Sequence, residues 1–259
     1  MQLAVLSDIH GNIVALDSVI ADLQQAGSAD AIWMLGDLAA FGSDPSAAIS
    51  QVQSLPNVEV IQGNTDRYLT AGVRPALPPP ANEEDWPKTS GRLAQRDSIF
   101  QWIYDQLSYD DFVYLKSLPT DLNLTVEKYG QLTAFHAAPG NDEFGFAPET
   151  DDDVIRNKLA GTPAGLVMMG HTHRPMDRQI GDWRVLNVGS VGLPFDGDPR
   201  AAYAILAFDS SGNLAVDLRR VPYDIEKEVE LLKTRANPGV KLQAARLRAG
   251  LLNPPNPAN

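Results

Sequence analysis

The sequence has no cysteine among its 259 residues. Disulfide bonds are therefore excluded, and no thiolate is available to bind a metal ion. Any metal site must use imidazole nitrogens with carboxylate or amide oxygens. This mixed ligation suits Mn²⁺, Fe or Zn²⁺ better than copper or iron–sulfur clusters. We expect Mn²⁺ first, with Fe and Zn²⁺ as the alternatives.

Long apolar runs are also missing. No stretch approaches the roughly 20 apolar residues that a helix needs to cross a bilayer. The amino terminus has no basic stretch followed by an apolar signal core. We therefore expect a cytoplasmic protein with no membrane partner.

Basic residues are outnumbered, with 21 Lys and Arg against 33 Asp and Glu and a formal net charge of −12. Acidic residues cluster at Glu83–Asp85 and Asp151–Asp153. A surface of this sign repels a long polyanion, which argues against nonspecific binding to duplex nucleic acid. A small phosphorylated substrate drawn to a local dication remains compatible with this charge. The oligomeric state stays open.

The first third of the sequence alternates between strand-like and helix-like segments. Apolar residues recur at helical spacing at Leu16, Val19, Ile20 and Leu23. Asp44 followed by Pro45 is typical of a helix that begins with an N-cap and a proline in its first turn. The resulting order β-α-β-α-β predicts a parallel sheet.

From Leu122 onward, apolar residues alternate with polar ones, which is the spacing of a strand. Turns near Gly130, Gly181 and Gly212 separate these segments and predict hairpins. The second half should therefore be more antiparallel, as part of a mixed sheet or as a second sheet that faces the first. We expect one α/β domain over residues 1–252.

Residues 71–91 interrupt this order. They are rich in proline and have no apolar period, which predicts a surface loop or lid. Apolar residues on one face between Ile99 and Leu107 predict a covering helix after it. We expect an inserted lobe of helix and loop over about residues 71–121, and a disordered tail over residues 253–259.

Seven side chains with metal-binding chemistry follow strand-like runs. They are Asp8, His10, Asp37, Asn64, His136, His171 and His173. In an open α/β sheet, the carboxyl ends of parallel strands meet at one crevice, so distance in sequence is no objection. Seven ligands exceed what one four-coordinate ion uses. Two ions that share a bridging carboxylate account for the surplus.

Simpler interpretations exist for each of these residues. A single histidine at a strand end is more often structural, and Asp or Asn readily caps a helix or stabilises a turn. The placement of all four histidines in such segments favours the metal site instead. A hydrolase with one zinc ion is a further alternative, but it would leave several ligands unused.

The ordered motifs resemble those of the calcineurin-like metallophosphoesterase superfamily. They are Asp8-x-His10, Gly36-Asp37, Gly63-Asn64-x-Asp66, His136 and Gly170-His171-x-His173. Residues 36–49 and 187–209 are similar to small bacterial and archaeal phosphoesterases of this superfamily. Five motifs in this order are specific, whereas a lone D-x-H is weak. The resemblance implies an αββα sandwich, in which two mixed sheets are flanked by helices.

The resemblance also implies how the ligands divide. Asp8, His10, Asp37 and His173 would hold one metal ion, and Asp37, Asn64, His136 and His171 the other, with Asp37 as the bridge. The second group supplies the expected catalytic residues. Two dications roughly 3.5–4 Å apart can activate a bridging hydroxide and neutralise phosphate oxygens.

Other residues near these motifs are candidates for supporting roles. We expect Asp66 to orient a group behind the metal ligands, or else to stabilise a turn, and Asn187 to hydrogen-bond to the histidine pair. The candidates for binding the substrate phosphate are Asn12, Arg67, Arg174 and Arg200. The alternative for each arginine is a solvated surface cation.

One position departs from the superfamily pattern. Phosphomonoesterases and protein phosphatases of the superfamily often carry, at the position of Thr65, a histidine that protonates the leaving oxygen. Threonine has no useful acidity, so we hypothesise a preference for aryl esters, nucleotide anhydrides or activated diesters. The expected function is hydrolysis of phosphodiester or phosphoanhydride bonds in small substrates. The alternative is a catalytically silent metal-binding scaffold with the same fold.

Overall fold

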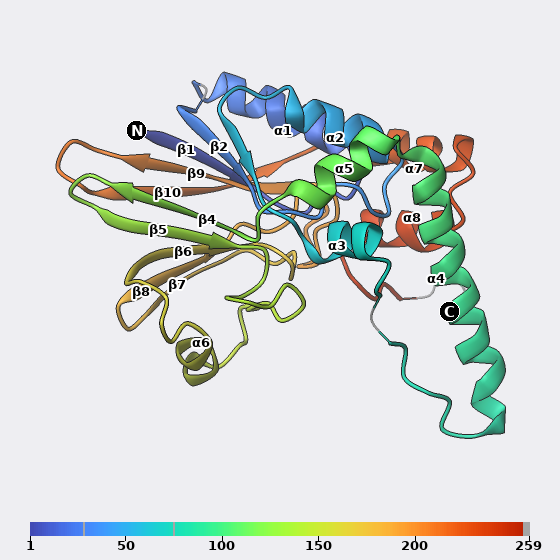
Figure 1. The fold of residues 1–259 in the computed structure, drawn as a ribbon. Coiled ribbons are helices and arrows are strands. Elements are labelled where there is room, and N and C mark those ends of the chain that lie inside the picture. Colours follow the sequence, from blue (N-terminus) through green and yellow to red (C-terminus); the bar gives the residue numbers. More distant parts are fainter. Residues whose placement is uncertain (28, 75, 256–259) are drawn as a thin grey trace.

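Two five-stranded mixed β-sheets pack face to face in the computed structural model (Figure 1), which describes residues 1–27, 29–74 and 76–255. The first sheet has the order β10-β9-β1-β2-β3. Its strands are Gln2–Leu6 (β1), Ala31–Met34 (β2), Val58–Val60 (β3), Ala201–Phe208 (β9) and Leu214–Val221 (β10). β1, β2 and β3 are parallel, as predicted, and β9 pairs antiparallel with both β1 and β10.

The second sheet has the order β4-β5-β6-β8-β7. Its strands are Asp121–Val126 (β4), Gly130–Phe135 (β5), Gly165–Met169 (β6), Met176–Ile180 (β7) and Trp183–Asn187 (β8). β5, β6 and β8 are parallel, whereas β4 and β7 are antiparallel edge strands. All three predicted hairpin turns are confirmed, and the second half forms a second sheet that faces the first.

Side chains of β1 alternate between the two faces of the first sheet, as the geometry of a strand requires. Leu3 and Val5 pack with residues such as Leu166 in the apolar layer between the sheets. Ala4 and Leu6 face the opposite way and pack against helices. Burial on both faces leaves the strand little freedom to shift its register, so the residues that follow it are held in place.

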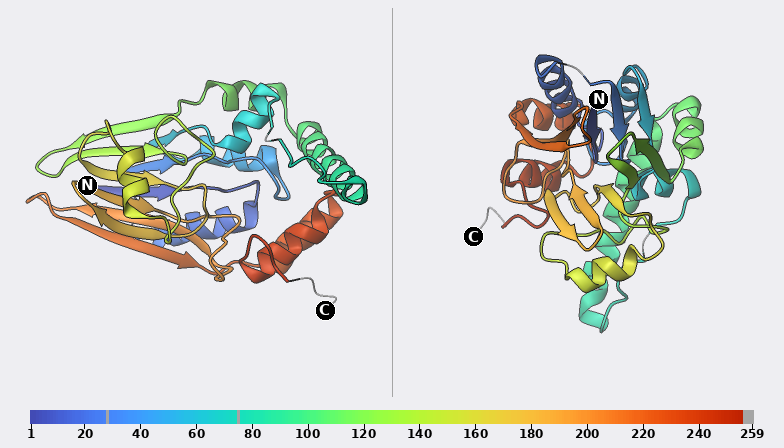
Figure 2. Two further views of the ribbon diagram at one scale, coloured as in Figure 1. Left: turned by 90° about the horizontal axis from the view of Figure 1, so that it is seen from below. Right: turned by 90° about the vertical axis from the view of Figure 1, so that its left-hand side faces the viewer.

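Helices cover the outer faces of both sheets, and in Figure 2 α1 and α6 lie on opposite sides of the sandwich. The helices outside the lobe are Ile13–Gln25 (α1), Pro45–Gln53 (α2), Asp152–Lys158 (α6), Ile225–Thr234 (α7) and Val240–Ala249 (α8). Asp44 caps α2 by accepting a hydrogen bond from Ala47 N at 3.1 Å, as predicted. The predicted αββα sandwich is therefore confirmed.

The segment between β3 and β4 carries the remaining helices. They are Asn64–Ala71 (α3), Glu83–Asp85 (η1), Trp86–Gln106 (α4) and Tyr109–Ser117 (α5). The predicted loop is too long, because α4 already begins at Trp86. Pro87 lies in the first turn of α4, where its missing N–H leaves no helical hydrogen bond unmade.

The long helix α4 lies at the same end of the sandwich as the C-terminal helices α7 and α8 (Figure 2). Ile99 and Ile103 of α4 are buried in the apolar cluster that also contains residues of α1 and α2, as the apolar spacing predicted. Trp102 Nε1 donates a hydrogen bond to Arg235 O at 2.9 Å. Of the tail that we predicted to be disordered, residues 256–259 lie outside the described residues. Within the described part of the chain, no helix is long and apolar enough to span a bilayer.

Candidate metal centre

The seven predicted ligands come together at one edge of the sandwich, where strands of both sheets end. β1 leads to Asp8 and His10, β2 to Asp37, β3 to Asn64, β5 to His136, and β6 to His171 and His173. All of these side chains are buried except that of His171, which is half-buried. The fold thus collects imidazole, carboxylate and amide groups from distant parts of the chain.

The first ligand group comprises Asp8, His10 and His173. Asp8 Oδ1 lies 3.2 Å from His173 Nε2, and the Nε2 atoms of His10 and His173 are 3.1 Å apart. Asp8 Oδ1 is buried and has no hydrogen-bond partner among the described residues. A buried carboxylate oxygen without a donor is costly, and a cation bound at this point would satisfy it.

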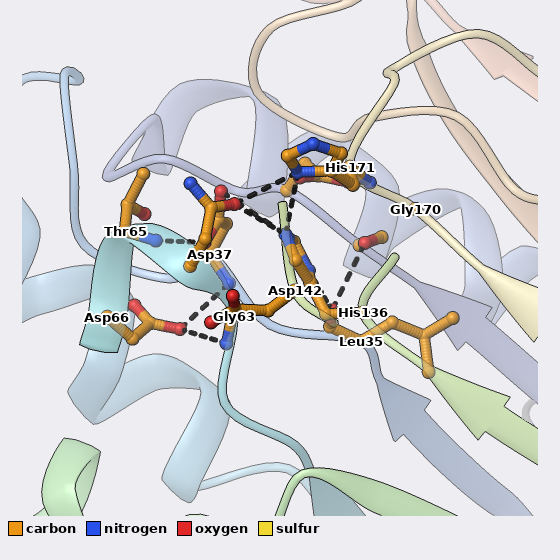
Figure 3. A network of polar contacts seen from close by, with 12 residues as sticks. Leu35, Asp37, Gly63, Thr65, Asp66, His136, Asp142, Gly170 and His171 are labelled. Atoms are coloured by element: carbon orange, nitrogen blue, oxygen red, sulfur yellow. Dashed lines mark hydrogen bonds and ion pairs between the residues drawn. The ribbon is translucent and has the colours of Figure 1, made fainter. Parts of the chain in front are cut away.

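The second ligand group comprises Asn64, His136 and His171, and Figure 3 shows the side chains of the two histidines close together. Asn64 Oδ1 lies 2.9 Å from His136 Nε2 and 3.0 Å from His171 Nδ1. The two imidazole nitrogens are 3.3 Å apart. Three potential ligand atoms therefore converge here from α3, β5 and β6.

Asp37 lies between the two groups. Its Oδ2 atom is 3.7 Å from His10 Nε2 in the first group and 3.6 Å from His136 Nε2 in the second. Its Oδ1 atom accepts a hydrogen bond from Thr65 N at 2.8 Å. The carboxylate is thus held by one oxygen, while the other faces both groups and could bridge two ions.

The hydrogen bonds behind the imidazoles determine which nitrogen carries a proton. His136 Nδ1 donates to Leu35 O at 2.7 Å, and His171 Nε2 donates to Glu143 O at 3.0 Å. A carbonyl oxygen only accepts, so the facing atoms His136 Nε2 and His171 Nδ1 are lone pairs when the rings are neutral. Two lone pairs 3.3 Å apart repel each other, and a cation between them removes this repulsion.

Burial also favours the protonation states that bind metal ions. It lowers the pKa of His10 to about 4. Burial and the charge of His136 lower the pKa of His171. Burial acts to raise the pKa of Asp8, but the charge and hydrogen bond of His173 outweigh it, and the pKa falls below its usual value. Neutral His10 and His171 and an ionised Asp8 can bind a metal ion without first losing a proton. His136 differs, because burial acts to lower its pKa but the charges of Asp37 and Asp8 outweigh burial and raise it.

Five of the seven ligands have left-handed backbone conformations, with φ between 53° and 63°. They are Asp8, His10, Asp37, His171 and His173. Asp and His adopt this region more readily than most residues, although it is uncommon for any residue other than glycine. Each ligand therefore lies in a sharp turn directly after its strand, and such strain is typical of functional sites.

Close packing of these turns requires glycine at two positions. A Cβ atom on Gly63 would lie 2.1 Å from Asp37 Oδ1, and one on Gly170 would lie 2.3 Å from Asp8 Oδ2. Both distances are far below van der Waals contact. The glycines in the motifs thus allow the ligand-bearing loops to approach one another.

Asp66 supports the turn that carries Asp37 (Figure 3). Its carboxylate accepts hydrogen bonds from the backbone N–H groups of Asp37 at 2.8 Å, Leu38 at 3.0 Å and Gly63 at 3.0 Å. Burial, followed by the charge of Asp37, raises the pKa of Asp66 to about 7. Asp66 therefore stabilises the turn that carries Asp37, and these contacts are compatible with the predicted role behind a metal ligand.

Asn187 supports the loop of the histidine pair through its backbone. Its Nδ2 atom donates to Gly170 O at 2.6 Å and to Thr172 Oγ1 at 3.0 Å. Its Oδ1 atom accepts from Gly189 N at 2.9 Å. The expected hydrogen bond to the imidazoles is thereby replaced by contacts with the loop around His171, because Asn187 ends the strand beside β6.

Asn12 has a structural role in place of the expected contact with phosphate. Its Oδ1 atom caps α1 by accepting from Ala15 N at 3.0 Å. Its Nδ2 atom donates to Gly192 O at 2.9 Å and to Tyr223 Oη at 3.3 Å. The amide group is buried and engaged at both ends, so we no longer propose it as a phosphate ligand.

The three arginines expected to bind phosphate all form ion pairs. Arg174 pairs with Glu149, and Arg200 pairs with Asp198 at 2.6 Å. Neither arginine lines the cleft described below. Arg67 pairs with Asp142 at 2.5 Å and with Glu143 at 2.7 Å. Since Glu143 O accepts from His171, the contacts of Arg67 hold the loop that supports the His171 ring.

A cleft of about 370 Å³ opens above the ligand groups. Its floor includes five of the seven ligands, and its walls include Leu77 and Phe100 from the lobe, Phe195, and Arg246 from α8. Sequence reasoning missed these wall residues. No local signal distinguishes Arg246 from Arg248 in the same helix, because only the tertiary structure turns one of them toward the cleft.

Residues 1–211 match the calcineurin-like phosphoesterase superfamily domain, and the chain belongs to this family. An uncharacterised protein of Methanocaldococcus jannaschii is 28% identical over 252 residues, which cover 90% of this chain and 93% of that protein. A solved metallophosphoesterase from Sphaerobacter thermophilus is 27% identical, with a TM-score of 0.74 and coverage of 97% of this chain and 99% of the other. Similarity to these proteins therefore extends across the lobe and the C-terminal helices.

A shorter match has a more specific name. The symmetrical bis(5'-nucleosyl)-tetraphosphatase of Pectobacterium atrosepticum is 33% identical over 72 residues. These cover 27% of this chain and 26% of that enzyme.

Proposed function

We propose that the protein is a dinuclear metal-dependent phosphoesterase that cleaves phosphodiester or phosphoanhydride bonds of small substrates. The observation that carries this proposal is Asp37 Oδ2, which lies 3.7 Å from His10 in one ligand group and 3.6 Å from His136 in the other. Two divalent ions bound there would supply a water-derived nucleophile at neutral pH and neutralise phosphate charge. Mn²⁺ is the metal that we would test first, then Fe and Zn²⁺.

The chain's own residues hold this arrangement before substrate arrives. Asp66 holds the backbone N–H of Asp37, Thr65 N holds the Asp37 carboxylate, and backbone carbonyls orient the rings of His136 and His171. Such prior positioning is a large part of catalytic power, because the groups need not reorganise during the reaction.

Among the described residues that line the cleft, no side chain outside the ligand groups is well suited to protonate the leaving group. Thr65 lines the cleft, and its hydroxyl is buried without a partner among the described residues. Tyr68 also lines the cleft, but burial raises the pKa of its phenol, which makes it a weaker acid. These observations support a preference for leaving groups that depart without protonation, such as aryl esters, activated diesters and nucleotide anhydrides.

The first test measures hydrolysis of bis-p-nitrophenyl phosphate and p-nitrophenyl phosphate by chelator-treated protein, before and after addition of Mn²⁺. We expect Mn²⁺ to restore activity in the wild type and not in Asp37→Asn. A protein that binds two ions and hydrolyses neither compound would support the alternative of a metal-binding scaffold.

The second test concerns the missing acid. Thr65→His should increase turnover of an alkyl phosphate, whose leaving group needs a proton, by roughly 10²-fold or more, which is the usual contribution of a general acid. Turnover of the activated aryl diester should change much less. An unchanged ratio of the two rates would contradict the leaving-group hypothesis. Thr65→Asn, which adds bulk without acidity, is the matched control.

A further inference from the structure

Arg246 differs from the other arginines around the cleft. Its Nε atom donates to Leu252 O at 2.9 Å, and its guanidinium carbon lies 6.0 Å from the centre of the Phe195 ring. Over the described chain, no carboxylate lies within 4.0 Å of its nitrogens. Arg96, which also lines the cleft, lies 3.2 Å from Asp97 Oδ1, and Arg67 and Arg248, which do not line it, are both ion-paired. Arg246 is thus a cation in the wall of the cleft with no acidic partner in the described part of the chain.

The surroundings of Arg246 make this arrangement costly in the absence of an anion. The side chain is half-buried, and this burial lowers the pKa of the guanidinium. Arginine nevertheless stays protonated in proteins, so the charge persists. An anionic partner stabilises a partly desolvated cation. The paired N–H donors of the guanidinium match the geometry of phosphate oxygens.

Phe195 connects Arg246 to the metal centre. The rings of Phe195 and His173 are stacked, with centroids 4.4 Å apart and planes 9° apart. The guanidinium carbon of Arg246 lies 6.0 Å from the centre of the same Phe195 ring. The distance from this carbon to the centre of the His173 ring is therefore at most about 10 Å. A short polyphosphate can cover such a span, with one phosphate at the metal centre and another at Arg246.

Apart from Arg96 and Thr65, the other walls of the cleft are apolar and aromatic. Leu77 and Phe100 belong to the lobe, Tyr68 to α3, and Leu252 to the segment after α8. Such surfaces favour a flat, largely apolar group such as a nucleobase. Arg246 and Leu252 lie beyond residue 211, where the match to the family domain ends.

We propose that Arg246 binds a second phosphate, one that is not cleaved, and that the apolar walls hold the nucleoside of the same substrate. The substrate class is therefore a nucleotide that contains a phosphoanhydride. This inference rests on the proposed function for the reaction, but the binding site that it describes can be tested without turnover.

The binding experiment uses α,β-methylene-ADP, which cannot be cleaved between its phosphates, and titration calorimetry with Mn²⁺-loaded protein. Arg246→Ala should weaken binding by about tenfold or more, because a charged hydrogen-bond donor to phosphate is lost. Arg248→Ala removes the same charge from the same helix outside the cleft, where Arg248 pairs with Glu226 at 2.7 Å. This control should change the affinity by less than about twofold.

A second pair of measurements separates phosphate from nucleoside. Methylenediphosphonate carries the two phosphorus groups without the nucleoside. Arg246→Ala should lower the affinity for both ligands. Leu77→Ala should lower the affinity for the nucleotide analogue more than the affinity for methylenediphosphonate. Arg246→Lys keeps the charge but loses the forked donors of the guanidinium. Its affinity for both ligands should lie between those of the wild type and the alanine variant. Thermal unfolding of each variant verifies that it is folded.

Three results would overturn the inference. They are absence of analogue binding by the wild type, equal affinity in Arg246→Ala and the wild type, and an equal loss of affinity in Arg248→Ala. If the wild type binds the analogue through Arg246 but hydrolyses no phosphate compound with any metal, the subsite stands and the proposed function fails. If hydrolysis occurs, Arg246→Ala should lower kcat/KM for ADP, and this fold-loss should be at least about ten times the fold-loss for bis-p-nitrophenyl phosphate. Bis-p-nitrophenyl phosphate has no second phosphate for Arg246 to bind.

Discussion

Replacement of Gly63 by alanine should damage the metal centre through a single methyl group. The added Cβ would lie 2.1 Å from Asp37 Oδ1 and 2.3 Å from Asp37 N, whereas ordinary contact begins near 3.4 Å. Either the loop after β3 or the turn that carries Asp37 must move by roughly 1.3 Å to restore contact distance. The backbone φ of Gly63 is −91°, so alanine meets no conformational strain there.

The expected cost has two components. Overpacking of this kind typically destabilises a protein by 1–3 kcal/mol, and we expect about 3 kcal/mol because the clash involves backbone as well as side chain. Displacement of Asp37 should also lower Mn²⁺ affinity by roughly 10–100-fold, as loss of a supporting contact does at other metal sites. Chemical denaturation measures the first effect and titration calorimetry the second.

Gly72 provides the matched control because it lies at the other end of α3. Its φ is +68°, and a Cβ there would have no heavy atom within 4 Å among those described. Gly72→Ala should therefore cost only the strain of a left-handed alanine, about 1–2 kcal/mol, and leave Mn²⁺ affinity unchanged. If Gly63→Ala binds Mn²⁺ as tightly as the wild type, the close approach does not position Asp37 and our reasoning is refuted.

Other perturbations test separate parts of the structure. Removal of bound metal should lower the melting temperature by roughly 5–10 °C, because ligand at 100 times its Kd contributes about 2.7 kcal/mol; equal melting temperatures with and without chelator would contradict a bound metal ion. Burial raises the pKa of Glu228 to about 7, so its carboxyl contributes stability below pH 4.5 that is lost as the pH rises to about 7. Glu228→Gln cannot titrate, so relative to the wild type it should gain up to about 3 kcal/mol in unfolding free energy between pH 4 and pH 8. A pH-independent difference in denaturation experiments would show that this carboxyl does not govern the pH dependence.

Local patterns determined most of the architecture. The apolar spacing and the Asp44-Pro45 start predicted α1 and α2, and turn residues predicted the three hairpins, because these signals act over a few neighbouring residues. The candidate ligands could also be selected locally, since each follows a strand-like run, and the structure brings them together. The start of α4 at Trp86 was missed because its first turns are exposed and therefore show no apolar period.

The tertiary structure decided which groups face one another. Asp66 contacts the backbone of Asp37 across 29 positions of sequence, and Asn187 holds the loop of Gly170 across 17. Arg246 and Arg248 are alike in sequence, yet one lines the cleft and the other pairs with Glu226 on the surface. The chemistry of each residue type and its local spacing are written in the sequence. Which side chains share a site depends on how the two sheets, the lobe and the C-terminal helices pack, because contacts between distant segments have no local pattern.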